Sequence, residues 1–225
     1  MSTSLRLVIG NKNYSSWSMR PWVLLREAGI AFEEVQLKFA ESDGGLTVAG
    51  IDRYSAAGKV PVLMVEGEPV WDTLAICETA AELFPQKQLW PADPKARRVA
   101  RSICAEMHSG FQALRDKMPM NIGKRYPGKG MDADVKRNID RIVEIWTACR
   151  GRFGKGGPLL FGRFSIPDAY YAPVVTRFQT YGVSLPKAAQ DYCEAVLALG
   201  AVRAWCEGAR REKEFVQADE PYATK

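Results

Sequence analysis

Histidine is almost absent from this sequence of 225 residues, which contains only His108. The five cysteines lie far apart in the chain and form no Cys-x-x-Cys motif: Cys77, Cys104, Cys149, Cys193 and Cys206. Structural zinc sites and thioredoxin-type redox pairs need clustered cysteine or histidine. We therefore expect no metal site, and scattered free thiols are typical of a reducing compartment.

Long apolar runs are also missing, because no stretch approaches the roughly 18 residues that a membrane helix needs. The N-terminal segment lacks the charged, apolar and small-residue order of a secretory signal. Lys and Arg give a net charge of +5 but do not form a long basic run. We expect a cytoplasmic protein that binds neither membrane nor nucleic acid, with a mild positive field that favours small anions.

What the sequence does contain is a mixed first part and a helical second part. Short apolar segments with β-branched residues alternate with helical periodicity up to Pro85, and Pro61 to Trp71 has the spacing of a tight hairpin. Residues 38–58 carry several glycines and are expected to be irregular. The expected strands are 5–9, 32–37, 61–65 and 69–71, and the expected helices of this part are 18–29 and 73–84.

After a linker at 86–94, which contains two prolines, the pattern becomes almost purely helical. The helices are expected near 95–118, 131–153, 166–181, 187–199 and 201–209. This order predicts an α+β domain at 1–85 (βαβ–ββα) followed by an all-helical domain at 95–225.

Hydroxyl groups cluster where the first strand gives way to the first helix, at Ser15, Ser16 and Ser18. The free N–H groups and the positive end of a helix dipole favour an anion there, and a thiolate is such an anion. Lowering the pKa of a thiol by about 2 units requires about 2.7 kcal/mol of preferential stabilisation. One hydrogen bond to a charged group contributes about 1.5–3 kcal/mol. A serine hydroxyl at this helix end can therefore activate a thiol, although the same serines can equally be plain N-caps.

Two further segments have the spacing of a ligand site. Val60-Pro61 follows a glycine-containing loop and opens a strand, so it is a candidate cis peptide whose backbone could pair with a peptide-like ligand. The alternative is an ordinary trans proline at a strand start. Asp72-Thr73 stands where a strand meets a helix, where Thr73 could be the N-cap and Asp72 could hold a ligand ammonium group.

Ser165 and Asp168 form a capping box at the start of a later helix, with a structural role. His108 has no matching nucleophile in sequence and is expected to be a surface or groove histidine.

Taken in this order, these segments resemble the soluble glutathione transferase family over essentially the whole chain. The resemblance implies a thioredoxin-like glutathione-binding domain at 1–85 and an all-helical C-terminal domain at 95–225. Ser15-Ser16-Trp17-Ser18 is similar to the Ser-Ser-Cys-Ser stretch of the zeta class, which implies that Ser15 activates the thiol. A count back from Arg20, as in theta-like sequences, gives Ser16, and Tyr14 is a third candidate. No cysteine precedes Cys77, which argues against the cysteine-type classes.

The resemblance also implies the ligand contacts. Val60 and Pro61 would pair with the cysteinyl part of glutathione, Asp72 and Thr73 would hold its γ-glutamyl end, and Lys59 would reach its glycyl carboxylate. Asp72 is one methylene shorter than the glutamate that the family usually has, and Trp17 replaces the zeta-class cysteine, so a zeta substrate does not follow.

The implied protein is a homodimeric enzyme with glutathione as co-substrate and a small hydrophobic electrophile as its second substrate. The expected walls of the electrophile site are Met107, Phe111, Tyr170 and the loop at 118–126. The alternatives are a glutathione-dependent cis-trans isomerase of the maleylacetoacetate type and a non-catalytic ligand-binding protein of the same fold.

Overall fold

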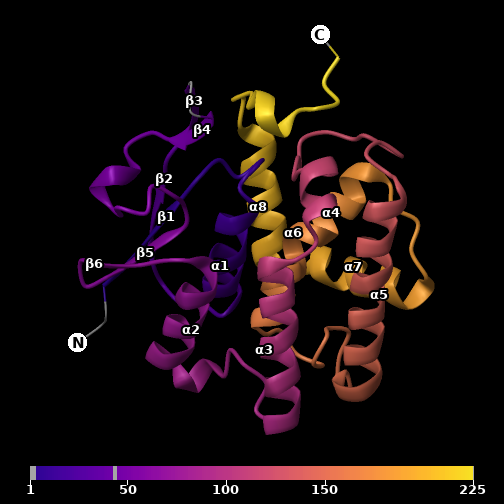
Figure 1. Ribbon diagram of the computed structural model, residues 1–225. Helices are drawn as coiled ribbons and strands as arrows, with labels where there is room; N and C mark the ends of the chain where they lie inside the picture. Colours follow the sequence, from indigo (N-terminus) through magenta and orange to yellow (C-terminus); the bar gives the residue numbers. More distant parts are fainter. Residues whose placement is uncertain (1–3, 43–44, 225) are drawn as a thin grey trace.

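The computed structural model describes residues 4–42 and 45–224, and its first part is built on a four-stranded sheet (Figure 1). The strand order is β2-β1-β5-β6. The elements are β1 (Leu5–Ile9), α1 (Ser16–Glu27), β2 (Glu33–Gln36), β5 (Val62–Val65), β6 (Glu68–Val70) and α2 (Thr73–Leu83). The predicted thioredoxin-like α+β fold of the first part is confirmed.

The sheet follows from the sequence pattern. The apolar strand β1 lies in the middle and pairs in parallel with β2, as expected for a strand–helix–strand unit. It pairs antiparallel with β5, which forms a hairpin with β6. Glu66 and Gly67 both have positive φ angles, 52° and 94°, and make the tight turn of this hairpin.

The segment expected to be irregular contains a second small sheet. Strands β3 (Phe39–Ser42) and β4 (Gly45–Val48) pair antiparallel, and the short 3-10 helix η1 (Ile51–Arg53) follows. Residues 43–44 lie outside the described part of the chain. The prediction that residues 38–58 are irregular was wrong for β3 and β4. Pairing between these two segments forms strands that their glycine-rich composition did not indicate.

The second part is helical, as predicted: α3 (Pro94–Ser109), α4 (Gln112–Lys117), α5 (Ala133–Phe153), α6 (Ile166–Tyr181), α7 (Lys187–Ala198) and α8 (Gly200–Arg211). The short 3-10 helices η2 (Pro85–Lys87) and η3 (Gln217–Asp219) precede and follow them. The helix expected at 95–118 is two helices, because Gly110 ends α3 and Phe111 adopts a left-handed φ of 61°. A Cβ on Gly110 would lie 2.8 Å from the carbonyl oxygen of Glu106, so glycine suits this break.

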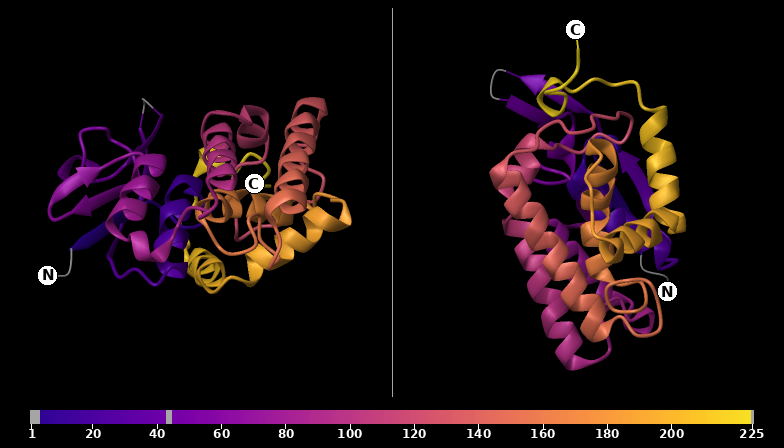
Figure 2. Two further views of the ribbon diagram at one scale, coloured as in Figure 1. Left: turned by 90° about the horizontal axis from the view of Figure 1, so that it is seen from below. Right: turned by 90° about the vertical axis from the view of Figure 1, so that its right-hand side faces the viewer.

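The two parts share one apolar core. Helix α1 packs against both α6 and α8, so that it lies between the sheet and the helical bundle (Figure 2, left view). Helix α6 is buried along almost its whole length. Its start is fixed by Asp168, whose Oδ2 accepts hydrogen bonds from the backbone N–H and the hydroxyl of Ser165 at 3.0 and 3.1 Å. The expected capping box is present.

No helix in the described ranges is long and apolar enough to cross a membrane. Within the same ranges, no group of three or more His, Cys, Asp or Glu side chains has the arrangement of a metal site.

Candidate active site

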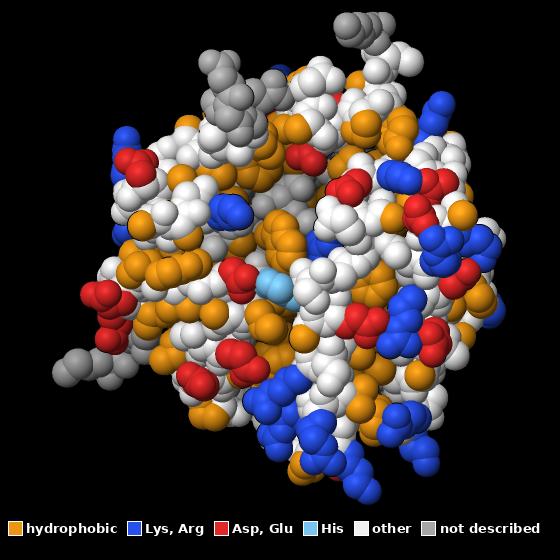
Figure 3. Space-filling model, in the orientation of Figure 1, with side chains coloured by type: hydrophobic (Ala, Val, Ile, Leu, Met, Phe, Trp, Pro, Cys, Tyr) orange, Lys and Arg blue, Asp and Glu red, His pale blue; other side chains and the backbone are white. Residues whose placement is uncertain are grey.

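A cleft of about 440 Å³ lies where the sheet part faces the helical part. The space-filling view shows this region as a hollow, with the single histidine at its rim (Figure 3). A second cavity of similar size is next to it and shares three lining residues with it, Trp17, Lys59 and Val60. The two cavities together form a continuous candidate site that receives side chains from β-strand loops, α1, α4, α6 and the C-terminal segment.

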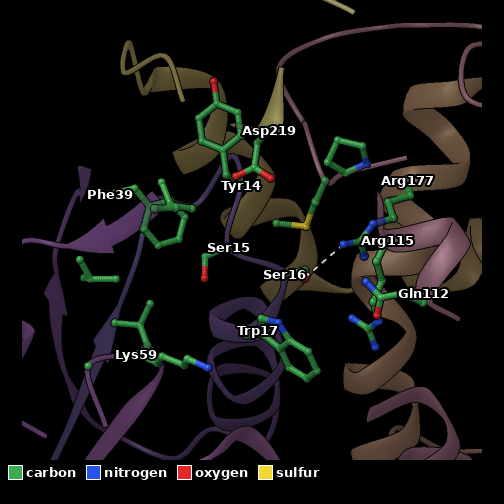
Figure 4. A pocket seen from close by; sticks show the side chains of 16 residues that line it. Tyr14, Ser15, Ser16, Trp17, Phe39, Lys59, Gln112, Arg115, Arg177 and Asp219 are labelled. Carbon is green, nitrogen blue, oxygen red and sulfur yellow. Dashed lines mark hydrogen bonds between the residues drawn. The ribbon is translucent and has the colours of Figure 1, made fainter. Parts of the chain in front are cut away.

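Ser15 and Ser16 both line the first cavity (Figure 4). Ser15 is the N-cap of α1, and its Oγ accepts the Ser18 backbone N–H at 3.3 Å and lies 2.8 Å from Ser18 Oγ. Ser18 is fully buried, and its Oγ also accepts the Gly10 N–H. Ser15 is therefore engaged in the cap that joins β1 to α1.

Ser16 has a different partner. Its Oγ accepts a hydrogen bond from the Arg177 guanidinium at 3.2 Å, drawn as the dashed line in Figure 4. Because the Ser16 oxygen is occupied by a cationic donor, its own hydrogen is free to point at an anion in the cleft. This contact joins the start of α1 to α6, which is 161 residues away. It gives Ser16 the stronger geometry for holding a thiolate.

Tyr14 uses its hydroxyl elsewhere. The hydroxyl donates to Glu220 Oε1 at 2.8 Å and lies 3.1 Å from the Glu214 carbonyl oxygen, and Figure 4 shows it directed away from Ser15 and Ser16. Burial and the neighbouring Glu220 raise the pKa of Tyr14. Its position therefore suits a structural tie to the C-terminal segment.

The Val60–Pro61 peptide bond is cis, as the sequence suggested. No described residue forms a hydrogen bond with the backbone N–H or C=O of Val60, so both groups are free for a ligand. Lys59 is exposed and lines both cavities. The segment Lys59–Val60 therefore offers backbone hydrogen-bonding groups for a peptide-like ligand next to a lysine cation.

Asp72, not Thr73, is the N-cap of α2, and its Oδ1 accepts the Leu74 N–H at 3.1 Å. Its Oδ2 lies 3.0 Å from Nε2 of His108. Thr73 is buried and its hydroxyl donates to the carbonyl oxygen of Trp17. Asp72, Thr73 and His108 all line the second cavity, so the histidine that had no partner in sequence has one in space.

Three arginines surround Trp17 and the first cavity. The guanidinium groups of Arg20 and Arg115 lie 4.4 and 4.7 Å from the centroid of the Trp17 ring. Arg20 and Arg177 are 0% and 4% exposed, and no described carboxylate lies within 4 Å of any of the three guanidinium groups. Burial and the neighbouring arginines lower the pKa of Arg177 to about 9.

Asp219, in η3, lines the same cavity and points into it from above the serines (Figure 4). Burial raises its pKa to about 6, although Arg177 opposes the shift. The next residue, Glu220, is buried and accepts hydrogen bonds from the hydroxyls of Tyr14 and Tyr126. Asp219 is therefore held in place by a fixed C-terminal segment.

Several expected walls of the electrophile site belong to the core. Met107 and Tyr170 are fully buried and Phe111 nearly so, and none of them lines the cleft. Of the predicted loop, Pro119 and Met120 do line it. The residues that sequence reasoning missed are charged: Arg115, Arg177 and Asp219. No local signal marks them, because each comes from a different segment.

The chain matches two family models. Residues 14–83 match the glutathione S-transferase N-terminal domain and residues 132–208 match the C-terminal domain. A probable maleylacetoacetate isomerase of Caenorhabditis elegans is 26% identical over 161 residues, which cover 70% of this chain and 73% of the relative. The maleylacetoacetate isomerase of Rattus norvegicus is 24% identical over 172 residues, covering 76% and 77%.

Solved structures agree on the architecture. A glutathione transferase homolog from Burkholderia gl BGR1, crystallised with bound glutathione, superimposes with a TM-score of 0.68 at 21% identity. The match covers 93% of this chain and 100% of that one. Both domain models match in the expected order, and the likeness of fold extends over nearly the whole chain. This chain belongs to the glutathione S-transferase family.

Proposed function

We propose that the protein binds glutathione across the two joined cavities and activates its thiol as a thiolate for attack on an electrophilic carbon. The observation that carries this proposal is the hydrogen bond from Arg177 to Ser16 inside the cleft. It leaves the Ser16 hydroxyl as a donor, reinforced by a cation, beside a backbone edge that is free to hold a peptide.

The lining residues support one binding mode for glutathione. The cysteinyl backbone pairs with Val60 next to the cis Pro61, and the γ-glutamyl end occupies the second cavity, near Asp72, Thr73 and the start of α2. The free N–H groups of a helix N-terminus suit the α-carboxylate of that end, and Asp72 suits its ammonium group. Lys59 is exposed at the junction and can pair with the glycyl carboxylate.

These groups can supply the free energy that is needed to lower the pKa of the glutathione thiol. A free thiol has a pKa near 8.5, and a shift of about 2 units needs about 2.7 kcal/mol. One charge-assisted hydrogen bond contributes about 1.5–3 kcal/mol. Ser16, supported by Arg177 and by the N-terminal end of α1, supplies such a bond. Ser15 supplies a second donor when its hydrogen bond with Ser18 reverses, so that the Ser18 hydroxyl donates to Ser15 and the Ser15 hydrogen is released.

Steady-state conjugation of a neutral aryl halide tests the proposal. We expect Ser16→Ala to lower kcat/KM about tenfold, Ser15→Ala about threefold, and the double variant about thirtyfold. The Kd for glutathione should stay nearly unchanged, because backbone groups hold the peptide. The exposed Ser102→Ala, on the outer face of α3, is the matched control. Turnover unaffected in the double variant would contradict the serine mechanism.

The second candidate is a glutathione-dependent cis-trans isomerase, supported by relatives that are named maleylacetoacetate isomerases. It uses the same thiolate, which adds to a double bond and leaves again after rotation. Assay of a cis-dienone acid in the presence and absence of glutathione separates isomerisation from stable conjugation. Glutathione binding without any thiolate absorbance would instead favour a protein that binds without turnover. A cytoplasmic homodimer with a role in detoxification belongs to the same proposal, and sedimentation equilibrium tests the dimer.

A further inference from the structure

The electrophile side of the cleft is cationic, in contrast to the apolar wall that a hydrophobic substrate would need. Arg177 and Arg115 both line the cavity, and Figure 4 shows their side chains extending from the helical part toward Ser16 and Trp17. Arg20 lies behind Trp17 and adds a third positive charge. Around these groups the described cleft residues offer one carboxylate, Asp219, and it forms no ion pair with them.

The hydrogen bonding of Arg177 is incomplete. Its Nε donates to the Met118 carbonyl at 2.9 Å and one terminal nitrogen donates to Ser16. The other terminal nitrogen is buried and has no partner among the described residues. A buried charge and a buried donor without partners are both costly. The missing partner is therefore expected to be an acceptor that arrives with a ligand.

Arg115 is the second cationic side chain that lines this side of the cleft. Two of its nitrogens donate to the carbonyl oxygens of Gly110 and Met107, which fixes the guanidinium beside the Trp17 ring. The break between α3 and α4 supplies the Gly110 carbonyl, so the same irregularity that ends α3 also positions Arg115 in the cleft. No carboxylate of the described chain pairs with it.

We propose that Arg115 and Arg177 form an anion subsite, and that the second substrate is a planar electrophile carrying a carboxylate. This inference rests on the proposed function, because it names the substrate class of the same site. Guanidinium groups bind carboxylates through paired N–H donors, and they do so best where water is excluded. The carboxylate neutralises the arginines, while the thiolate at Ser16 faces the electrophilic carbon.

Asp219 modulates this subsite. The charged groups that face it are Arg177 from α6 and its neighbour Glu220; those that face Arg177 are Arg20, Arg115 and Asp219, with Tyr181 on its own helix. An ionised Asp219 repels an incoming carboxylate, and a neutral one does not. The subsite therefore binds an acid more tightly when Asp219 is protonated.

The test uses a matched pair of conjugates. In the parent reaction the glutathione thiolate attacks the chlorine-bearing carbon of 4-chloro-3-nitrobenzoate, a C–S bond forms, the C–Cl bond breaks and chloride leaves with the electron pair. The thiol proton goes to solvent. The two probes are the purified product, S-(4-carboxy-2-nitrophenyl)glutathione, and its benzoate methyl ester, and their Kd values are measured by calorimetry on the full chain.

We expect the acid conjugate to bind about tenfold more tightly than the ester, and this preference to fall toward one in Arg115→Gln and in Arg177→Gln. Arg137→Gln, an exposed change of equal charge on α5, should keep the preference. Asp219→Asn should increase it. Replacing the buried Arg177 can itself unfold the protein. Arg115 is only partly buried, so Arg115→Gln provides the independent variant.

Equal or tighter binding of the ester by the wild-type protein would overturn the anion subsite, as would a preference that persists in both arginine variants. Turnover of the two parent electrophiles is measured separately, with each rate divided by the uncatalysed rate with glutathione. A protein that shows the binding preference but no turnover would contradict the proposed activity and retain the subsite. Turnover without the binding preference for the acid would contradict the anion subsite and retain the proposed activity.

Discussion

The two halves of the cleft are constructed differently. The half that we propose to hold glutathione, called the glutathione half, is made of short contiguous segments of the first part, at Lys59 to Pro61 and Asp72-Thr73. These segments meet at the ends of strands and at the start of α2. The half that we propose to hold the electrophile, called the electrophile half, combines Arg115 from α4, Arg177 from α6 and Asp219 from η3. The first half presents backbone groups of Val60 and the exposed side chains of Lys59 and Asp72. The second presents charged side chains that are buried, as in Arg177, or partly buried, as in Arg115 and Asp219. Local sequence determines the first half, and the packing of the helical part determines the second.

The largest expected effect concerns whether the two halves fold together. Asp168 accepts hydrogen bonds from the N–H of Leu160, both donors of Ser165 and the hydroxyl of Tyr192. Asp168→Ala leaves these groups unpaired, and we expect a loss of about 3 kcal/mol in the free energy of unfolding. Urea denaturation followed by circular dichroism and by tryptophan fluorescence should give coincident transitions. Separate transitions would break the view that one core joins both halves.

The next effect distinguishes the halves by their kinetics. Arg177→Gln removes the cation behind Ser16, so we expect kcat for a neutral electrophile to fall about tenfold, with little change in the KM for glutathione. Steady-state kinetics with each substrate varied in turn provide the measurement. A variant that lost glutathione affinity instead would show that Arg177 belongs to the glutathione half.

Asp72→Asn is expected to have a smaller effect, and on the KM for glutathione instead of on kcat. The variant keeps a cap for α2 but loses the charge that suits the ligand ammonium group, so the KM for glutathione should rise about fivefold. The ratio of acid to ester binding should not change, since Asp72 lies in the second cavity. A change in that ratio would mean that the halves are electrostatically coupled.

The smallest effect is a pH dependence within the electrophile half. The pKa of Asp219 is raised to about 6 by burial. Asp219 is therefore ionised above about pH 6 and becomes neutral as the pH falls through this value. The preference for the acid conjugate should rise about two- to threefold between about pH 7.5 and pH 5, and Asp219→Asn should abolish this rise. A preference that is flat with pH in the wild-type protein would contradict the role of Asp219.

The sequence predicted several local structural features of the first half, including the cis peptide before Pro61, for a physical reason. A strand-to-helix junction with serines, a proline that opens a strand and an acidic–hydroxyl pair before a helix are each local patterns, and they occur in the order of the family fold. Within the pair, however, the cap is Asp72 and not the expected Thr73. The parallel pairing of β1 with β2 followed from the strand–helix–strand unit, and the antiparallel pairing of β5 with β6 followed from the hairpin. The pairing of β1 with β5, which joins these two units into one sheet, did not. The sequence also allows Tyr14 as the residue that activates the thiol. Its hydroxyl instead donates to Glu220, 206 residues away, and no local pattern reveals this contact.

The electrophile half could not be predicted in the same way. Arg177 lies on a helix buried along nearly its whole length, where a sequence pattern suggests a packed side chain or a surface position and not a partner 161 residues away. Arg115 enters the cleft because α3 stops at Gly110, which helical periodicity alone did not reveal. The hairpin of β3 and β4 also depends on pairing between segments that show no clear alternation. In each case long-range packing decided the outcome.

The central claim is that Ser16, supported by Arg177, lowers the pKa of the bound thiol. Titration of the ultraviolet absorbance of the thiolate in the complex with glutathione measures this directly, in the wild-type protein and in Ser16→Ala. We predict a thiol pKa about 2 units below that of free glutathione in the wild-type complex, and a rise of at least about one unit in the variant. Identical titration curves for the two complexes, or a wild-type curve equal to that of free glutathione, would contradict the account.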